Sequence, residues 1–203
     1  MSETPETYVR HPLGLPPGSV RALLAVMITG LFVLLLALPA DKPFEMPLFL
    51  YFLMSLLLVF VTAHGKTIET VSGQSPFGMP KGTFRFIIAA LVIAVVAWRF
   101  WTDQAVLLKR LTPTEHQLGQ WPYLCAALFG GFLAGRLLRM GPWRTKAMFQ
   151  DMLAWVSLLC MIGLAIETLA ILFVGPNVAG GLNMSMLEAI LTAAIALYFG
   201  ARS

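Results

Sequence analysis

The amino-acid sequence predicts an all-α, polytopic membrane protein, a bundle of six transmembrane helices. Of its 203 residues, 58% are hydrophobic and only 12% are charged, and the mean hydropathy is +0.80. Soluble domains carry roughly 25% charged residues, which keep their surfaces hydrated. Here the charges fall between apolar runs, each near the roughly 20 residues that a helix needs to cross a bilayer. Because backbone polar groups must be bonded internally in lipid, we expect each run to be a helix.

The expected spans cover residues 19–39, 47–64, 83–101, 121–140, 150–174 and 183–201. The first span ends in ALPA, as a cleaved signal peptide can, but Glu3 and Glu6 precede it. The segment that opens it is also repeated inside the chain, so we expect a retained span. Between the third and fourth spans, Val106, Leu107, Leu108 and Leu111 predict a short helix over 104–111 that dips into the headgroup region.

A ten-residue segment occurs twice, as PLGLPPGSVR over 12–21 and as PFGMPKGTFR over 76–85. Five positions are identical: Pro12/Pro76, Gly14/Gly78, Pro16/Pro80, Gly18/Gly82 and Arg21/Arg85. Because two spans separate the copies, both copies enter the membrane from the same side, and the repeats are parallel. The sequence therefore predicts a single membrane domain over 1–203 that is built from three hairpins. They are repeat 1 over 12–75, repeat 2 over 76–140 and a degenerate third unit over 141–203.

Each part of the repeated segment has an expected local role. Pro and Gly set turns and delay the helix, and Ser19 and Thr83 stand where an N-cap residue belongs. Arg21 and Arg85 follow in the first turn, from which they can extend to lipid phosphates. Two interpretations stay open. The segment is either a general membrane-entry device or a headgroup or partner contact formed by both copies, with candidate residues Gly14, Pro16, Ser19, Arg21, Gly78, Pro80, Thr83 and Arg85.

The distribution of basic residues predicts the orientation. Ten Lys and Arg residues flank the spans on the side that holds both termini, and four flank them on the other side. Because cytoplasmic loops are enriched in Lys and Arg, we expect both termini to lie in the cytoplasm. The expected location is a bacterial inner (cytoplasmic) membrane.

Two acidic residues, Glu167 and Glu188, lie clearly within the expected spans. They stand on consecutive helices joined by a short turn, each about 8–10 Å from the outer end. Intramembrane carboxyl groups are costly and are candidate ion or proton sites. The alternative is that each is protonated or hydrogen-bonded to the backbone.

A stripe of small residues marks the fourth span. Ala127, Gly131 and Gly135 recur every four residues, a spacing that allows close packing of helices in lipid. The stripe packs either within one chain or between two copies.

The sequence contains no H-E-x-x-H, G-x-S-x-G, phosphate-binding glycine loop or C-x-x-C pattern. We therefore expect no catalytic residues, metal ligands or cofactor, and no enzymatic activity. Cys125 and Cys160 fall in apolar runs and are expected to be packing residues. The expected partners are the lipid bilayer and other membrane subunits or a second copy. The net charge of +4 comes without a basic run, which argues against nucleic acid.

The predicted function is accordingly that of an anchor, a scaffold or a subunit of a membrane complex. The alternative is a small transporter or channel-like protein that handles protons or cations through Glu167 and Glu188.

Overall fold

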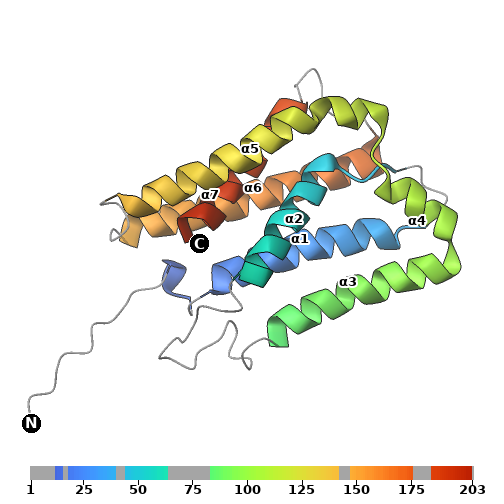
Figure 1. The fold of residues 1–203 in the computed structure, drawn as a ribbon, viewed down its shortest axis with the longest axis horizontal. Helices are drawn as coiled ribbons and strands as arrows, with labels where there is room; N and C mark the ends of the chain where they lie inside the picture. Colours follow the sequence, from blue (N-terminus) through green and yellow to red (C-terminus); the bar gives the residue numbers. More distant parts are fainter. Residues whose placement is uncertain are drawn as a thin grey trace, which may run out of the picture.

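The computed structural model describes residues 12–15, 18–39, 44–63, 83–141, 147–175 and 184–202. These residues form a 3₁₀ turn, η1 (Pro12–Gly14), and seven α-helices, with no strand among them (Figure 1). The helices are α1 (Ser19–Ala37), α2 (Leu48–Ala63), α3 (Thr83–Thr102), α4 (Gln104–Leu111), α5 (Glu115–Met140), α6 (Ala147–Val174) and α7 (Met184–Arg202). The predicted all-α class is confirmed.

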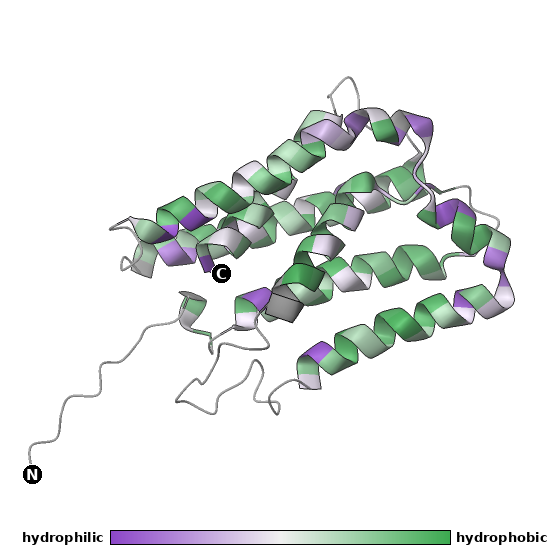
Figure 2. Cartoon of the chain, viewed as in Figure 1, coloured by the Kyte–Doolittle hydropathy of each residue, from purple (hydrophilic) through white to green (hydrophobic). Residues whose placement is uncertain are grey.

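Five helices contain segments that are long and apolar enough to cross a membrane. The segments are Ser19–Ala37, Thr83–Thr102, Gln117–Met140, Met148–Val174 and Ser185–Arg202. Hydrophobic residues run along these helices, while hydrophilic residues gather toward the two ends of the bundle (Figure 2). A multi-pass membrane protein is therefore supported by both helix length and composition.

The expected span over 47–64 forms α2, which has 16 residues. At about 1.5 Å per residue this helix is roughly 24 Å long, short of the roughly 30 Å of a hydrocarbon core. It crosses α1 obliquely instead of lying alongside it (Figure 1). A sixth span consequently stays a prediction.

Helix α1 lies at the centre of the bundle and packs against α2, α3 and α6. Its side chains Leu24, Ile28 and Leu35 are fully buried, together with Phe49 and Leu53 of α2. This concentration of large aliphatic side chains places the hydrophobic core around α1. Helix α7 packs against both α5 and α6 and closes the other half of the bundle.

The two predicted hairpins of the repeat pack differently. Helices α1 and α2 contact each other, as expected for a hairpin. By contrast, the helices of the second predicted hairpin, α3 and α5, lie on opposite sides of the bundle (Figure 1). Helix α3 packs on α1, and α5 packs on α7. The second copy of the repeat therefore does not close on itself, and the internal repeat stays a prediction from the sequence.

The helix ends form two layers. Helices α1, α3 and α6 begin, and α5 and α7 end, at one end of the bundle, which we call the basic end (Figure 1). The predicted short helix over 104–111 is present at the opposite end as α4. Its Leu107, expected to dip into the headgroup region, instead packs in the protein core, while Leu108 is exposed. The same face of α4 carries Arg110, whose guanidinium group donates hydrogen bonds to carbonyl oxygens at the end of α1.

Candidate functional site

The first copy of the repeated segment begins with residues in the left-handed region of backbone conformation. Gly14 has φ of 65° and Gly18 has φ of 85°. Leu13, which is not a glycine, has φ of 58°. A Cβ disfavours this region, which explains why two positions of the segment are glycine. The Leu13 N–H donates a hydrogen bond to Asp151 Oδ1 of α6 at 2.7 Å. This bond fixes the N-terminal turn to the basic end.

The expected N-caps are wrong. Gly18 is the N-cap of α1 and makes no side-chain capping bond, while Ser19 is the first helical residue. The Ser19 hydroxyl is buried and has no hydrogen-bond partner among the described residues. Thr83 is likewise the first residue of α3 and not a residue preceding it. The left-handed glycine replaces the hydroxyl as the residue that starts the helix.

Arg21 and Arg85 lie at the basic end, within electrostatic range of each other. Arg21 is half-buried, and its Nη1 donates to the carbonyl oxygen of Arg202 at 3.5 Å. Arg202 in turn donates from Nη2 to Gln150 Oε1 at 3.0 Å. Of the other residues predicted here, Pro16, Gly78 and Pro80 lie outside the described residues.

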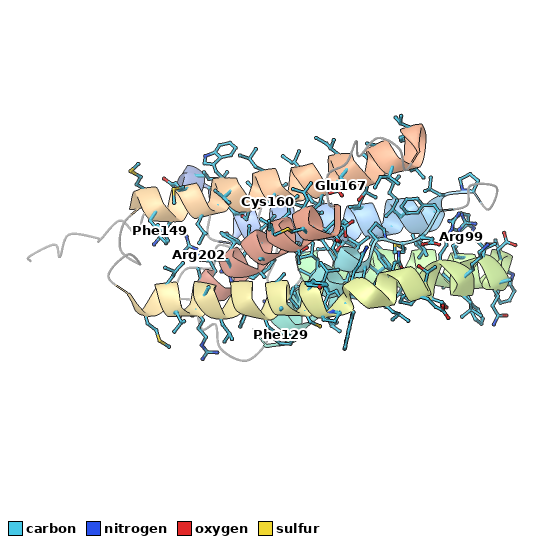
Figure 3. The ribbon with its side chains drawn as sticks, turned by 90° about the horizontal axis from the view of Figure 1, so that it is seen from above. Arg99, Phe129, Phe149, Cys160, Glu167 and Arg202 are labelled. Carbon is cyan, nitrogen blue, oxygen red and sulfur yellow. The ribbon has the colours of Figure 1, made fainter. Side chains whose placement is uncertain are left out.

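Glu167 of α6 faces α7 (Figure 3), and the two carboxyl groups of the predicted pair lie within electrostatic range. Both carboxyl oxygens of Glu167 are buried and have no hydrogen-bond partner among the described residues. A buried carboxyl group without a partner is costly when ionised, which favours a proton or a cation at this position. The alternative was that Glu167 is protonated or hydrogen-bonded to the backbone. No such hydrogen bond is seen in the described part of the chain, and a protonated Glu167 stays a prediction.

Glu188 opens onto a pocket of about 130 Å³ at the end of the bundle opposite the basic end. Its lining comes from α5, α6, α7 and the segment before α2: Phe44, Glu45, Pro47, Gln117, Thr168, Ile171 and Glu188. Two acidic residues and an amide residue therefore line one small cavity. Such a lining suits a small cation or ammonium group better than an anion.

Hydrogen bonds fix the wall of this pocket. Thr114 is the N-cap of α5, and its backbone N–H donates to Gln117 Oε1 at 3.3 Å, forming a capping box. Gln117 Nε2 donates to the carbonyl oxygen of Met46 at 3.0 Å. The Thr114 hydroxyl donates to Glu45 Oε2 at 3.1 Å. The segment before α2 is thus attached to the first turn of α5.

The stripe of small residues on α5 lies against α7. A Cβ added at Gly131 would overlap the carbonyl oxygen of Ala193, and one at Gly135 would overlap that of Leu197. From the other side, a Cβ at Gly200 would overlap the carbonyl oxygen of Phe132. The helices meet backbone to backbone at these glycines. Ala127, the third member of the stripe, is half-buried one turn earlier.

Two arginines that the sequence analysis counted only as outer flanking charges bind the C-terminal end of α1. Arg99 of α3 and Arg110 of α4 are 6% and 5% exposed. Their guanidinium groups donate to the last carbonyl oxygens of α1 and the residues after it: Leu35, Leu36, Ala37, Leu38 and Pro39. Arg99 Nε reaches Leu36 at 2.9 Å, and Arg110 Nη2 reaches Pro39 at 2.6 Å.

The charge of these arginines persists despite burial. Burial, together with the nearby Arg99 guanidinium, lowers the pKa of Arg110, but an arginine stays protonated at neutral pH. A cation at a helix C-terminus also interacts favourably with the helix dipole. Arg99 ends the predicted third span and Arg110 lies in the predicted helix over 104–111, but their partner on α1 is visible only in three dimensions.

The arrangement offers carboxyl groups near a small cavity at one end and clustered arginines at the other. Among the described residues, no group of three or more His, Cys, Asp or Glu side chains could hold a metal ion. Cys125 and Cys160 are free thiols, each half-buried. Comparisons with protein-family models, with curated proteins and with solved structures find no match to this chain.

Proposed function

We propose that this protein is an integral membrane subunit or scaffold that contacts another membrane protein, or a second copy, through α3. The supporting observation is the exposure of this helix, of which Arg99 is the one buried residue. Phe86 is 74% exposed and Ile93 is 67% exposed. Lipid can cover such a surface, but α3 also presents small residues along it.

The small residues favour a protein partner for α3. Ala90, Ala94 and Ala97 are exposed and lie on one face of the helix at spacings of four and three residues. On α5, glycines let the backbone of α7 approach. Alanines at such spacing allow a helix of another chain to approach closely, although not as closely as glycines do.

Site-specific photocrosslinking tests this proposal. A photoreactive phenylalanine analogue at Ala94 should give a protein adduct in membranes, identified by mass spectrometry. The same analogue at Leu133 of α5, which is 57% exposed, is the matched control and should crosslink mainly to lipid. Lipid adducts alone at both positions would contradict a subunit role for α3.

A second function, proton or cation handling, is favoured by the buried carboxyl group of Glu167 beside Glu188 and the pocket. In proteoliposomes, Glu167→Gln combined with Glu188→Gln should abolish a proton or cation flux that the wild type supports. Glu115→Gln, at an exposed position on α5, is the control and should leave the flux unchanged. A wild type without flux, or equal flux in the double variant, rules this function out.

We also propose an inner-membrane location with both termini in the cytoplasm and no enzymatic activity. The basic residues at one end of the bundle support the orientation, through their preference for the cytoplasmic side. The carboxyl groups and arginines described above lack the nucleophile, base and metal arrangements that define catalytic sites.

A further inference from the structure

The pocket beside Glu188 presents mainly hydrogen-bond acceptors to a ligand. The Thr168 hydroxyl donates its proton to the carbonyl oxygen of Leu164 at 2.8 Å, and Gln117 Nε2 donates to that of Met46. Glu188 makes no hydrogen bond or ion pair within the part of the chain that the structure describes. Carboxylate and hydroxyl oxygens are therefore left to accept hydrogen bonds from a ligand that carries N–H groups.

A further hydroxyl group lies beneath the pocket on α7. Thr192 is fully buried and stands one turn deeper than Glu188 on the same face of the helix. Its hydroxyl has no hydrogen-bond partner among the described residues. Side chains lean toward the N-terminal end of their helix, and for α7 this end carries the pocket. A polar ligand above Thr192, or a water bound to it, would satisfy this buried hydroxyl.

The lining of the pocket carries negative charge without a compensating cation. Glu45 and Glu188 both belong to the lining, which includes no Lys, Arg or His. Glu45 accepts a hydrogen bond from the Thr114 hydroxyl through Oε2, and its charge remains. Two like charges beside one cavity repel each other, and a cation placed between them removes the repulsion.

The size and the apolar walls of the pocket restrict the kind of cation. Its volume is about 130 Å³, and an apolar cavity of about 150 Å³ holds benzene, so there is room for about five non-hydrogen atoms. Phe44, Pro47 and Ile171 supply the apolar part of the lining. A bare metal ion would leave these side chains without a contact, whereas a short hydrocarbon chain would cover them.

We propose that this pocket binds a small organic ammonium ion with a short apolar chain. The ammonium group donates to the carboxylates of Glu188 and Glu45, in charge-assisted hydrogen bonds that are stronger than those between neutral groups. The hydrocarbon chain contacts Phe44, Pro47 and Ile171. This inference rests on the cation handling proposed above as a second function, for which it names the class of ligand.

Butylammonium has the size and the charge that the pocket requires, and it is the probe. A scintillation proximity assay measures binding of the radiolabelled ion to the full-length protein in detergent. Unlabelled butylammonium should displace the label. A large excess of potassium, or of 1-butanol as the uncharged analogue of the same length, should not displace it.

Two variants with matched controls locate the binding site. Glu188→Gln removes the charge at nearly constant volume and should weaken binding about tenfold. Glu115→Gln, at an exposed position on α5, should bind as the wild type does. Ile171→Phe fills the pocket and should abolish binding, whereas Ile166→Phe, the same change at an exposed position on α6, should not.

Three results would overturn the proposal. Displacement by potassium as effective as that by butylammonium would make the site one for inorganic cations. Equal displacement by 1-butanol would reduce it to an apolar cavity, and equal weakening in Glu188→Gln and Glu115→Gln would place binding elsewhere. Elution volume and melting temperature establish that each variant is folded. If Glu188→Gln does not fold, the comparison of Ile171→Phe with Ile166→Phe decides.

Binding and transport can fail separately. Butylammonium binding by a wild type that carries no flux in proteoliposomes would support the ammonium site and refute only the transport function. A proton or cation flux without butylammonium binding would keep the transport function and overturn the ammonium site.

Discussion

At the scale of single residues, Arg99 and Arg110 determine how α1 ends inside the protein. The last carbonyl groups of a helix lack intrahelical partners, and burying them without a donor costs free energy. The two guanidinium groups supply these donors and hold α3 and α4 against α1. The arginines therefore act as a C-cap that comes from other helices.

Arg99→Gln should destabilise the protein strongly. The change removes charged donors from buried carbonyl groups, a loss on the order of 3 kcal/mol in the free energy of unfolding. Thermal unfolding in detergent, followed by tryptophan fluorescence, should show a clear drop in melting temperature. Arg136→Gln, at an exposed position, should leave the melting temperature unchanged. Equal melting temperatures for Arg99→Gln and the wild type would show that water replaces the guanidinium.

Residue identity predicted the start of α1 only approximately. A Ser before an apolar run is the usual N-cap signal, yet Gly18 takes that position because the chain enters with φ of 85°. Before this helix, the Leu13 N–H bonds to Asp151, 138 residues away in sequence. No local pattern contains that contact. The sequence assigned the glycines of the repeated segment a turn-forming role, and Gly14 and Gly18 have left-handed conformations that it did not predict. Gly78 and Gly82 lie outside the described residues.

At the scale of helices, the contact between α5 and α7 depends on glycines, which have no side chain to hold the two backbones apart. The four-residue spacing of Gly131 and Gly135 predicts a close helix contact, because such residues fall on one face. The spacing does not identify the partner helix, which is set by the chain path and by small residues such as Gly200 on α7. In the structure the stripe is used within one chain.

Gly131→Ala should destabilise this contact, whereas Gly130→Ala should not. A Cβ at Gly131 overlaps the backbone of Ala193, so the helices must separate, at a cost of about 1–3 kcal/mol. A Cβ at the adjacent Gly130 meets nothing within 4 Å. Melting temperatures of the two variants, measured in the same detergent, give the comparison. Similar melting temperatures would mean that α5 and α7 do not pack through these glycines in the membrane protein.

At the scale of the whole molecule, apolar run length predicted where most helices lie, because crossing a bilayer imposes both length and composition. It did not predict that α2 would be short and oblique. It also did not predict that α3 would lie at the edge of the bundle, because an apolar run has the same composition in a protein core and against lipid. The carboxyl pair was predicted from depth and helix order alone. The pocket beside Glu188 was not, since its wall depends on the bonds of Gln117 and Thr114.

The orientation of the bundle in the membrane is the remaining prediction, and the structure shows which of the basic residues behind it are buried. Of the four basic residues assigned to the outer side, Arg99 and Arg110 are buried as caps of α1, and Lys109 is exposed on α4. Both guanidinium groups keep their charge, but they are buried against carbonyl oxygens of α1 and are not exposed where lipid phosphates could meet them. The excess of basic residues at the basic end is therefore larger than the sequence count alone suggests, and that end should face the cytoplasm.

Cysteine labelling of intact cells measures this orientation on α5, whose ends lie at opposite ends of the bundle (Figure 1). In a background with Cys125→Ser and Cys160→Ser, a membrane-impermeant maleimide should label Glu115→Cys directly. It should label Gly141→Cys only after permeabilisation. Ala154→Cys, at a fully buried position, should stay unlabelled in both conditions and thereby exclude access through the bundle. Labelling of Gly141→Cys in intact cells would reverse the orientation, because a helix with its C-terminal end outside requires every other helix end to exchange sides.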